Sequence, residues 1–160
     1  MLSDVQIKRV WEGMISAEIR SDYFAELSGG YQSKQKLATW TTLFLSSGAT
    51  ISLITSLPAE LSWVRIALVG FTAAVSLYSV VMQNQKLAVD ASDLHARWNR
   101  LSMEYTRLWE NVYVDDALER LNSLDDKAVE LSKTGTAFPN RRKSMLKWQL
   151  HVEAQHGIHA

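Results

Sequence analysis

Cations that could bind phosphate gather near the C-terminus of the chain. Arg141, Arg142 and Lys143 are consecutive, and Lys147 follows one helical turn later. In an assembly of several subunits these side chains could clamp a cyclic oligonucleotide through charge-assisted hydrogen bonds, or they could touch anionic lipid headgroups. A lone basic triplet is more often a solvated helix face, and the sequence favours that interpretation.

Three of the four histidines also lie in this region, at His151, His156 and His159. Glu153, His156 and His159 follow one another at helical spacings of three and could in principle hold a metal ion. Gly157 interrupts that turn, and chain ends tend to fray, so a mobile polar tail is the favoured interpretation. We therefore expect no metal site and no cofactor.

The composition excludes several classes of enzyme. There is no cysteine, so a disulfide framework, a Cys-ligated zinc site and a thiol nucleophile are absent. No P-loop, GxSxG, HExxH or DxDxG pattern occurs. Lys plus Arg equals Asp plus Glu at 17 each, which argues against a nucleic-acid binder driven by bulk positive charge. We expect a protein that is not an enzyme.

The elements that must position these residues are helices, because 47% of the chain is hydrophobic and only 2 residues are proline. Two runs, Leu37–Ala59 and Ile66–Gln85, contain no charged side chain, and Trp40 and Trp63 lie near their starts. A helix needs about 20 apolar residues to cross a bilayer, and indoles favour its interfaces. The runs predict a two-helix transmembrane hairpin; a buried hairpin in a soluble α-protein is the alternative.

Lysine and arginine residues predict the orientation of this hairpin. They lie before the first run and after the second, whereas the turn between the runs offers only Arg65. Because such cations stay on the cytoplasmic side, we expect a multi-pass membrane protein with both termini in the cytoplasm. The flanking cations are Arg20, Lys34, Lys36, Lys86, Arg97 and Arg100.

Hydroxyl and amide groups are the polar side chains that remain in the two runs. Proton relays, voltage sensors and coupled transporters need ionisable groups at membrane depth, so those classes lose their main support. In each run these side chains share one helical face and form a stripe. The two stripes could line a hydrated pore in an oligomer, but helix–helix packing is the favoured role. The stripe residues are Thr39, Thr42, Ser46 and Thr50 in the first run, and Thr72, Ser76, Ser79 and Gln83 in the second.

Apolar residues after the second run recur at alternating spacings of four and three, the heptad pattern of packed helices. We call this row of residues the seam. It predicts one unbroken helix from about Val64 to Val112, and its uneven side-chain sizes suit a mixed bundle or an oligomer. The seam residues are Leu87, Ala91, Leu94, Trp98, Leu101, Tyr105, Leu108 and Val112.

A first amphipathic helix is predicted to lie along this seam. Ser3 is its expected N-cap, and Gly29-Gly30 is its expected break. Its apolar stripe consists of Ile7, Val10, Trp11, Met14, Phe24, Leu27 and Tyr31.

Two further helices are expected after the seam. Asp116 and Glu119 have the spacing of a capping box, which predicts a helix to about Leu131. Its expected apolar residues are Leu118, Leu121 and Leu124. A loop over residues 132–139 then leads to a last helix capped by Asn140. The predicted organisation is a cytosolic helix at 1–36, a transmembrane hairpin at 37–85, a cytosolic helical extension at 86–131, and a loop with a short basic helix at 132–160.

Short motifs in three helices resemble the SLATT family, the SMODS- and SLOG-associating two-transmembrane effector domains of prokaryotic anti-phage defence systems. They are Ala17-x-x-x-x-x-Tyr23-Phe24, Leu43-Phe44-Leu45-Ser46-Ser47-Gly48-Ala49, Leu94-His95 and Leu101-Ser102-Met103-Glu104-Tyr105. The resemblance covers most of residues 3 to 131. It implies an all-α membrane protein, a two-transmembrane helical hairpin extended by long cytosolic helices, and a homo-oligomer.

The resemblance also implies a membrane effector that arrests or kills the infected cell after a cytosolic sensor is triggered, either a reverse transcriptase–msDNA complex or a nucleotide second messenger. A single hairpin cannot enclose a pore, so permeabilisation would require several subunits in the lipid bilayer. Two alternatives stay open: a cyclic-oligonucleotide receptor that uses the C-terminal basic helix, and a membrane scaffold that conducts nothing.

Overall fold

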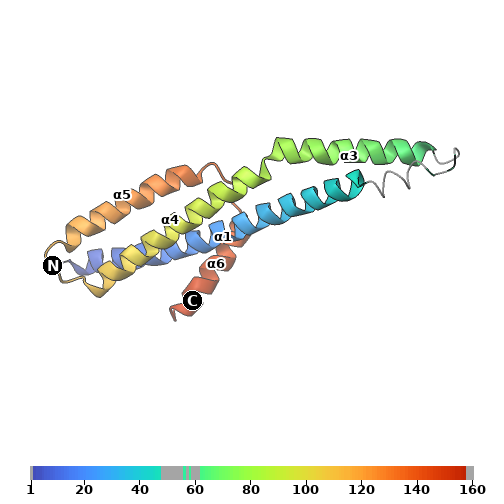
Figure 1. Cartoon of the computed structure of the whole chain (residues 1–160). Coiled ribbons are helices and arrows are strands. Elements are labelled where there is room, and N and C mark those ends of the chain that lie inside the picture. The colour runs from blue at the N-terminus through green and yellow to red at the C-terminus, as the bar shows by residue number, and fades with distance from the viewer. Residues whose placement is uncertain (1, 48–55, 57, 59–61, 158–160) are drawn as a thin grey trace. The chain divides into compact units, whose positions relative to one another are not determined.

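The computed structural model describes residues 2–47, 56, 58 and 62–157, and this part of the chain forms helices and no strand. The helices are α1 (Asp4–Ser46), α3 (Ser62–Met82), α4 (Asn84–Glu110), α5 (Ala117–Gly135) and α6 (Arg142–Gln155) (Figure 1). The predicted all-α class is confirmed for these residues. The chain divides into two compact units: the first joins Met1–Leu27 to Asp90–Ala160, and the second is Ser28–Val89.

The first unit is a helical bundle whose core follows the heptad pattern of α4. Seven seam residues are buried, namely Ala91, Leu94, Trp98, Leu101, Tyr105, Leu108 and Val112. Leu87, at the start of the seam, is half-buried and belongs to the second unit. The other helices add Val10, Met14, Ala17 and Phe24 from α1, Leu121, Leu124 and Leu131 from α5, and Val152 from α6. Burial of these side chains at spacings of three and four supplies the main driving force for the bundle.

The start of α1 is fixed by a reciprocal capping box. The backbone N–H of Gln6 donates to Ser3 Oγ at 3.4 Å, and the Ser3 N–H donates to Gln6 Oε1 at 2.8 Å. Two backbone donors that would otherwise lack partners are thereby satisfied. The predicted N-cap at Ser3 is confirmed.

The predicted break at Gly29-Gly30 is wrong, because α1 continues through both glycines to Ser46. Each glycine costs a helix about 1 kcal/mol relative to alanine. Burial of a large apolar side chain contributes about 1.5–3 kcal/mol. Leu27 and Tyr31 are both buried, before and after the glycine pair, and their burial outweighs the local preference.

The predicted unbroken helix from Val64 to Val112 is also wrong, since Gln83 separates α3 from α4. Gln83 has a φ of 44°, in the left-handed region that a non-glycine residue rarely adopts. Its carbonyl nevertheless accepts the first backbone hydrogen bond of α4, from Leu87 N–H at 3.0 Å. Asn84, directly after the break, is buried, and no partner for its side-chain amide lies among the described residues.

The C-terminal helix boundaries differ from the predicted ones. Asp116 makes no side-chain cap for α5 and instead binds Arg120 at 2.7 Å, so the predicted capping box is wrong. Leu118 is exposed, not apolar core, and α5 continues beyond Leu131 to Gly135. Arg141, not Asn140, is the N-cap residue of α6. Local backbone bonds close α5, where the Thr136 N–H donates to Lys133 O, and at the start of α6 the Arg141 N–H donates to the Tyr23 hydroxyl of α1.

Candidate functional site

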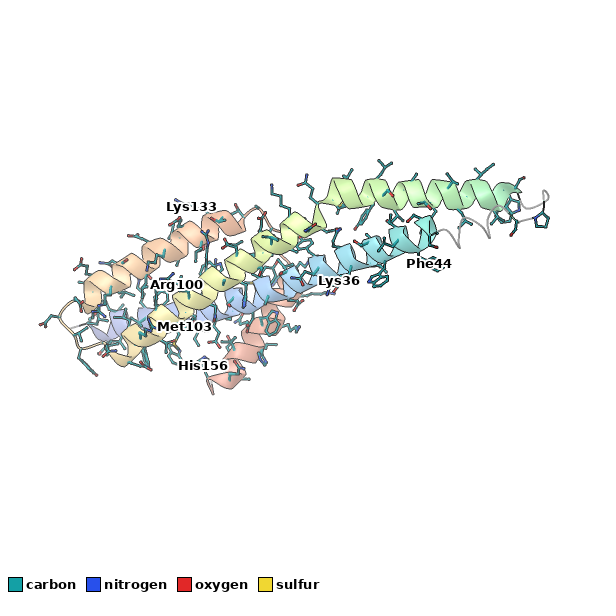
Figure 2. All side chains as sticks on the ribbon, in the orientation of Figure 1. Lys36, Phe44, Arg100, Met103, Lys133 and His156 are labelled. Carbon is teal, nitrogen blue, oxygen red and sulfur yellow. The ribbon has the colours of Figure 1, made fainter. Side chains whose placement is uncertain are left out.

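α3 presents an apolar surface along its length. It carries no charged residue after Arg65, and none of its described side chains is buried (Figure 2). The exposed fraction reaches 75% at Ile66 and 74% at Val81. α3 also exposes Trp63, Val69, Phe71, Leu77, Tyr78 and Met82, and the last part of α1 exposes Leu37, Trp40, Leu43 and Phe44. Monomeric soluble proteins rarely expose large contiguous apolar patches, so this surface is a candidate interaction site.

Among the described residues, no helix combines the length and the apolarity that crossing a bilayer requires. The described residues include only part of the predicted hairpin. Residues 48–55, 57 and 59–61 lie outside them, as do the side chains of Ser79 and Val80.

Three hydroxyls of the predicted stripes donate their protons to carbonyls of their own helices. Thr42 Oγ1 donates to the Ala38 carbonyl at 2.9 Å, and Thr72 Oγ1 donates to the Leu68 carbonyl at 2.8 Å. Ser46 Oγ likewise donates to Leu43 O at 3.3 Å, and Thr39 Oγ1 accepts from Gln35 Nε2 at 3.5 Å. Of the remaining stripe residues, Ser76 is half-buried, Gln83 is exposed, and Thr50 and the Ser79 side chain lie outside the described residues.

The structure divides the predicted basic cluster into two parts. Arg141, Arg142 and Lys143 are exposed at the start of α6. Lys147 is bound elsewhere: its Nζ donates to Glu26 Oε2 at 2.8 Å and lies 4.5 Å from the centre of the Trp148 ring. Lys147 is exposed but paired with Glu26, whereas no ion pair of Arg141, Arg142 or Lys143 occurs among the described residues.

Glu26 of α1 is the anchor of α6 in the first unit. Its carboxylate accepts hydrogen bonds from Ser144 Oγ at 3.0 Å, Lys147 Nζ at 2.8 Å and Trp148 Nε1 at 2.8 Å. The hydrogen bond from Lys147 is the largest cause that lowers the pKa of Glu26, and those from Ser144 and Trp148 lower it further. Three donors from one face of α6 thus converge on one carboxylate.

Loss of the Glu26 charge should loosen α6. The Glu26→Gln variant keeps the shape of the side chain but weakens three hydrogen bonds, and hydrogen bonds to charged groups contribute about 1.5–3 kcal/mol each when shielded from water. Glu26 is half-buried, so we expect a smaller combined loss of about 1–2 kcal/mol. Trypsin cleavage at Arg141, Arg142 and Lys143 should then accelerate about fivefold or more, measured on the full chain.

The matched control is Glu153→Gln, which alters an exposed pair with Gln149 on the same helix and should leave cleavage unchanged. The pH dependence gives a second check. Because the folded-state pKa of Glu26 is lowered from 4.5, its contribution is full above pH 4.5 and is lost as the pH falls through the lowered value. Equal cleavage of Glu26→Gln and wild type at pH 7 would contradict the anchor.

A second group of titratable side chains joins α6 to α1 and corrects the expectation of a mobile tail. His156 Nε2 lies 2.9 Å from Glu18 Oε2, and its ring stands edge-on to Trp11 at 5.3 Å. Burial raises the pKa of Asp22, and the charge of Glu18 raises it further. No cluster of three metal-ligating side chains occurs among the described residues; His159 of the predicted trio lies outside them.

Sequence analysis missed this docking surface, although the signal was present. Glu18, Asp22 and Glu26 recur every four residues and form an acidic stripe on α1. On α6 the donors Ser144, Lys147 and Trp148 share one face, and His156 follows the last turn of the helix. Two helices with complementary stripes are expected to pair, but their separation in the sequence hides the match from local pattern analysis.

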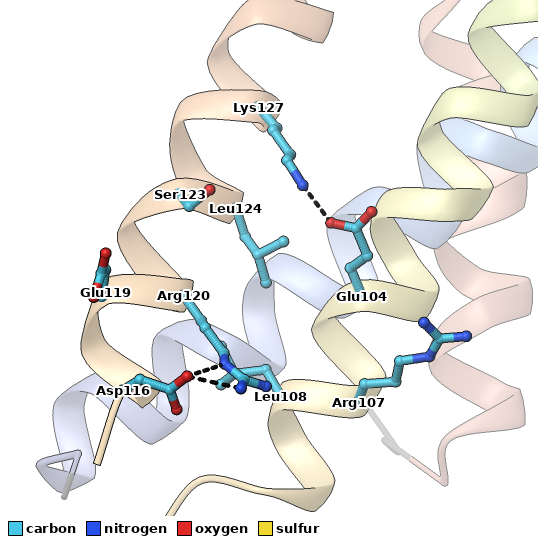
Figure 3. A pocket seen from close by; sticks show the side chains of 9 residues that line it. All are labelled: Glu104, Arg107, Leu108, Asp116, Glu119, Arg120, Ser123, Leu124 and Lys127. Atoms are coloured by element: carbon cyan, nitrogen blue, oxygen red, sulfur yellow. Dashed lines mark hydrogen bonds and ion pairs between the residues drawn. The ribbon is translucent and has the colours of Figure 1, made fainter. Parts of the chain in front are cut away.

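A charged groove runs between α4 and α5, with a cavity of about 440 Å³ (Figure 3). Lys127 Nζ bonds to Glu104 Oε2 at 2.6 Å across the groove, and Arg120 bonds to Asp116 at its end. Acidic and basic side chains are equal in number in its lining: Glu104, Asp116 and Glu119 against Arg107, Arg120 and Lys127. The Lys127–Glu104 pair joins the two helices, and the balanced lining gives no net attraction for an anion.

Comparisons of this chain with protein-family models, with curated proteins and with solved structures find no match.

Proposed function

We propose that this chain is a membrane effector of a bacterial anti-phage defence system. In this proposal the second unit inserts into the inner membrane, several copies assemble, and activation permeabilises the membrane to arrest or kill the infected cell. The observation that carries the proposal is α3, a helix with exposed apolar side chains and no charge after Arg65. A lipid bilayer covers such a surface without any need for polar contacts.

The hydroxyl geometry supports membrane insertion. In hydrocarbon every polar group must find a partner inside the protein, and Thr42 and Thr72 already bond to carbonyls of their own helices. Trp40 and Trp63 are 71% and 66% exposed, and indoles of this kind are favoured at membrane interfaces.

Permeabilisation is favoured over coupled transport because Ile66–Gln85 holds no Asp, Glu, Lys, Arg or His. The resemblance to the SLATT family supports the role in defence and a cytosolic activator, either a reverse transcriptase–msDNA complex or a nucleotide second messenger. A cyclic-oligonucleotide receptor is the second candidate, favoured by the exposed triplet Arg141, Arg142 and Lys143. A scaffold that conducts nothing would share the membrane insertion and lack the depolarisation.

The test is expression of the chain with and without the genes that neighbour its own, while membrane potential and growth are followed. In the double variant Thr72→Leu with Ser76→Leu, depolarisation and toxicity should be lost, since a pore without charged rings must be lined by hydroxyl groups. Membrane insertion should persist, because added apolar side chains favour it.

The matched control is Ala67→Leu with Ala74→Leu. Both alanines are exposed on the same helix, and their positions lie about half a turn away from Thr72 and Ser76. This control should insert and depolarise like the wild type. If the hydroxyl double variant loses the oligomer, the stripe acts in helix packing; unchanged leakage from an intact oligomer rules out this stripe as the lining. Recovery of the wild-type chain in the soluble fraction would overturn the proposal itself.

A further inference from the structure

A second cavity lies within the first unit, away from the charged groove and from the anchor of α6. Its volume is about 400 Å³, which is in the range of small-molecule sites. Arg20 and Phe24 of α1, Trp98 of α4, and Ser132, Phe138 and Asn140 near the end of α5 contribute to its lining. The lining of this cavity thus combines polar and aromatic side chains.

The cation in this cavity has no counterion. Arg20 is half-buried, and no carboxylate forms an ion pair with it among the described residues. Its Nη1 donates to Ser132 Oγ at 2.7 Å, and its guanidinium lies 4.8 Å from the centre of the Trp98 ring. Burial lowers the pKa of Arg20, which is the sign of an uncompensated charge. An anion that entered the cavity would remove this penalty.

A buried donor on the same wall also lacks an acceptor. The Trp98 side chain is 1% exposed, and its Nε1–H has no hydrogen-bond partner among the described residues. A buried donor that stays unsatisfied costs about 1–3 kcal/mol. Arg20 therefore provides the N–H groups that a carboxylate or phosphate oxygen in the cavity would accept, whereas the Trp98 Nε1 atom is itself buried.

Aromatic rings form the apolar part of the cavity. Phe24 and Phe138 meet edge to face at 5.6 Å, and Tyr23 packs against Phe24 at 5.3 Å. The Tyr23 hydroxyl donates to the Pro139 carbonyl and accepts from the Arg141 N–H, so it holds the segment after α5 in place. The aromatic wall is thus fixed before any ligand arrives.

We propose that this cavity binds a small aromatic anion, with its carboxylate or phosphate on Arg20 and its ring on the Phe24–Phe138 pair. The site is independent of membrane insertion and of the exposed basic triplet. Binding would strengthen the contacts among α1, α4 and the segment after α5, because all three contribute to the lining.

The experiment is ¹⁹F NMR titration of the full chain in detergent with 4-fluorophenyl phosphate, 4-fluorobenzoate and the neutral 4-fluorobenzyl alcohol. We expect saturable binding of at least one anion in the millimolar range or tighter, and at least tenfold weaker binding of the alcohol. The tighter of the two anions identifies the head group. Arg20→Gln should weaken anion binding at least tenfold, whereas Arg142→Gln, which removes an exposed cation of α6, should leave it unchanged.

A second variant keeps the test decisive if Arg20→Gln fails to fold. Phe138→Ala removes one ring from the wall and should reduce the affinity of the aromatic anion to that of inorganic phosphate or acetate. Equal binding of the alcohol and the anions overturns the proposal. So does anion binding that is unchanged in a folded Arg20→Gln variant, or in Phe138→Ala.

Discussion

Replacement of Leu101 with aspartate should abolish the first unit as a folded bundle. Leu101 is 2% exposed at the middle of the α4 seam, where the neighbouring positions Trp98 and Tyr105 are also buried. An unpaired carboxylate at that position costs several kcal/mol, and the cavity left by the leucine side chain adds to the loss. Domains are stable by only about 5–15 kcal/mol in total, so one such change is sufficient to unfold a marginal bundle.

Near-ultraviolet circular dichroism and resistance to trypsin would measure this loss, and size-exclusion chromatography in detergent would follow the proposed oligomer. Leu101→Met is the matched control, since it nearly conserves volume and should cost less than about 1.5 kcal/mol. A Leu101→Asp protein with the wild-type oligomer and wild-type trypsin resistance would show that the seam is not the core.

The second large effect is expected at Gly13, where the usual rule for helical glycines should be reversed. Alanine in place of a helical glycine normally stabilises by about 1 kcal/mol. At Gly13 an added Cβ would lie 2.6 Å from Tyr105 Cε1 and 2.7 Å from Tyr105 Cζ. Such distances are too short for carbon atoms, so the ring must move.

Burial and a hydrogen bond both restrict movement of the Tyr105 ring. It is buried, and its hydroxyl donates to Asp125 Oδ1 at 2.6 Å; Asp125 in turn pairs with Arg9. Burial and the hydrogen bond to Asp125 raise the pKa of Tyr105, which keeps the hydroxyl protonated as a donor. To admit a methyl group the bundle must shift this whole set of contacts, and overpacking of this kind costs about 1–3 kcal/mol.

We therefore expect Gly13→Ala to lower the free energy of unfolding by about 1–2 kcal/mol, measured by urea denaturation in detergent. Gly29→Ala, with nothing within 4 Å of the added Cβ, is the control and should raise the stability of its helix by about 1 kcal/mol. Opposite signs for the two glycines are the expected result. A stabilising effect of Gly13→Ala would mean that Tyr105 moves aside freely.

Local periodicity predicted the core of the first unit but not the helix ends. Trp98, Leu101 and Tyr105 follow a heptad, and the heptad is a property of neighbouring turns that is visible in the sequence. The end of α3 depends on Gln83 in a left-handed conformation, and glutamine has no local preference for that region. At the glycine pair 29–30 the local pattern predicted a break that the structure lacks, because burial of Leu27 and Tyr31 outweighs the small local cost of the glycines.

The contacts that hold α6 could not be predicted from local patterns for a different reason. Glu26 and Trp148, like Glu18 and His156, are joined only after the chain has folded back on itself. Lys147 illustrates the consequence: beside Arg141–Lys143 it has the appearance of a fourth phosphate ligand, and its partner is in fact a carboxylate of α1. The unpaired state of Arg20 is equally invisible in the sequence, since it depends on which acidic residues fail to reach it.

The first unit is built from two segments that are far apart in the sequence, so its parts are synthesised at different times. Val10, Met14 and Phe24 leave the ribosome early, but their partners on α4 are made only after the whole of Ser28–Val89. At roughly 5–20 residues per second, the apolar face of the N-terminal segment stays uncovered for on the order of 10 s. Ser28–Val89 is synthesised during that interval, so the bundle is completed only after the whole second unit has been made.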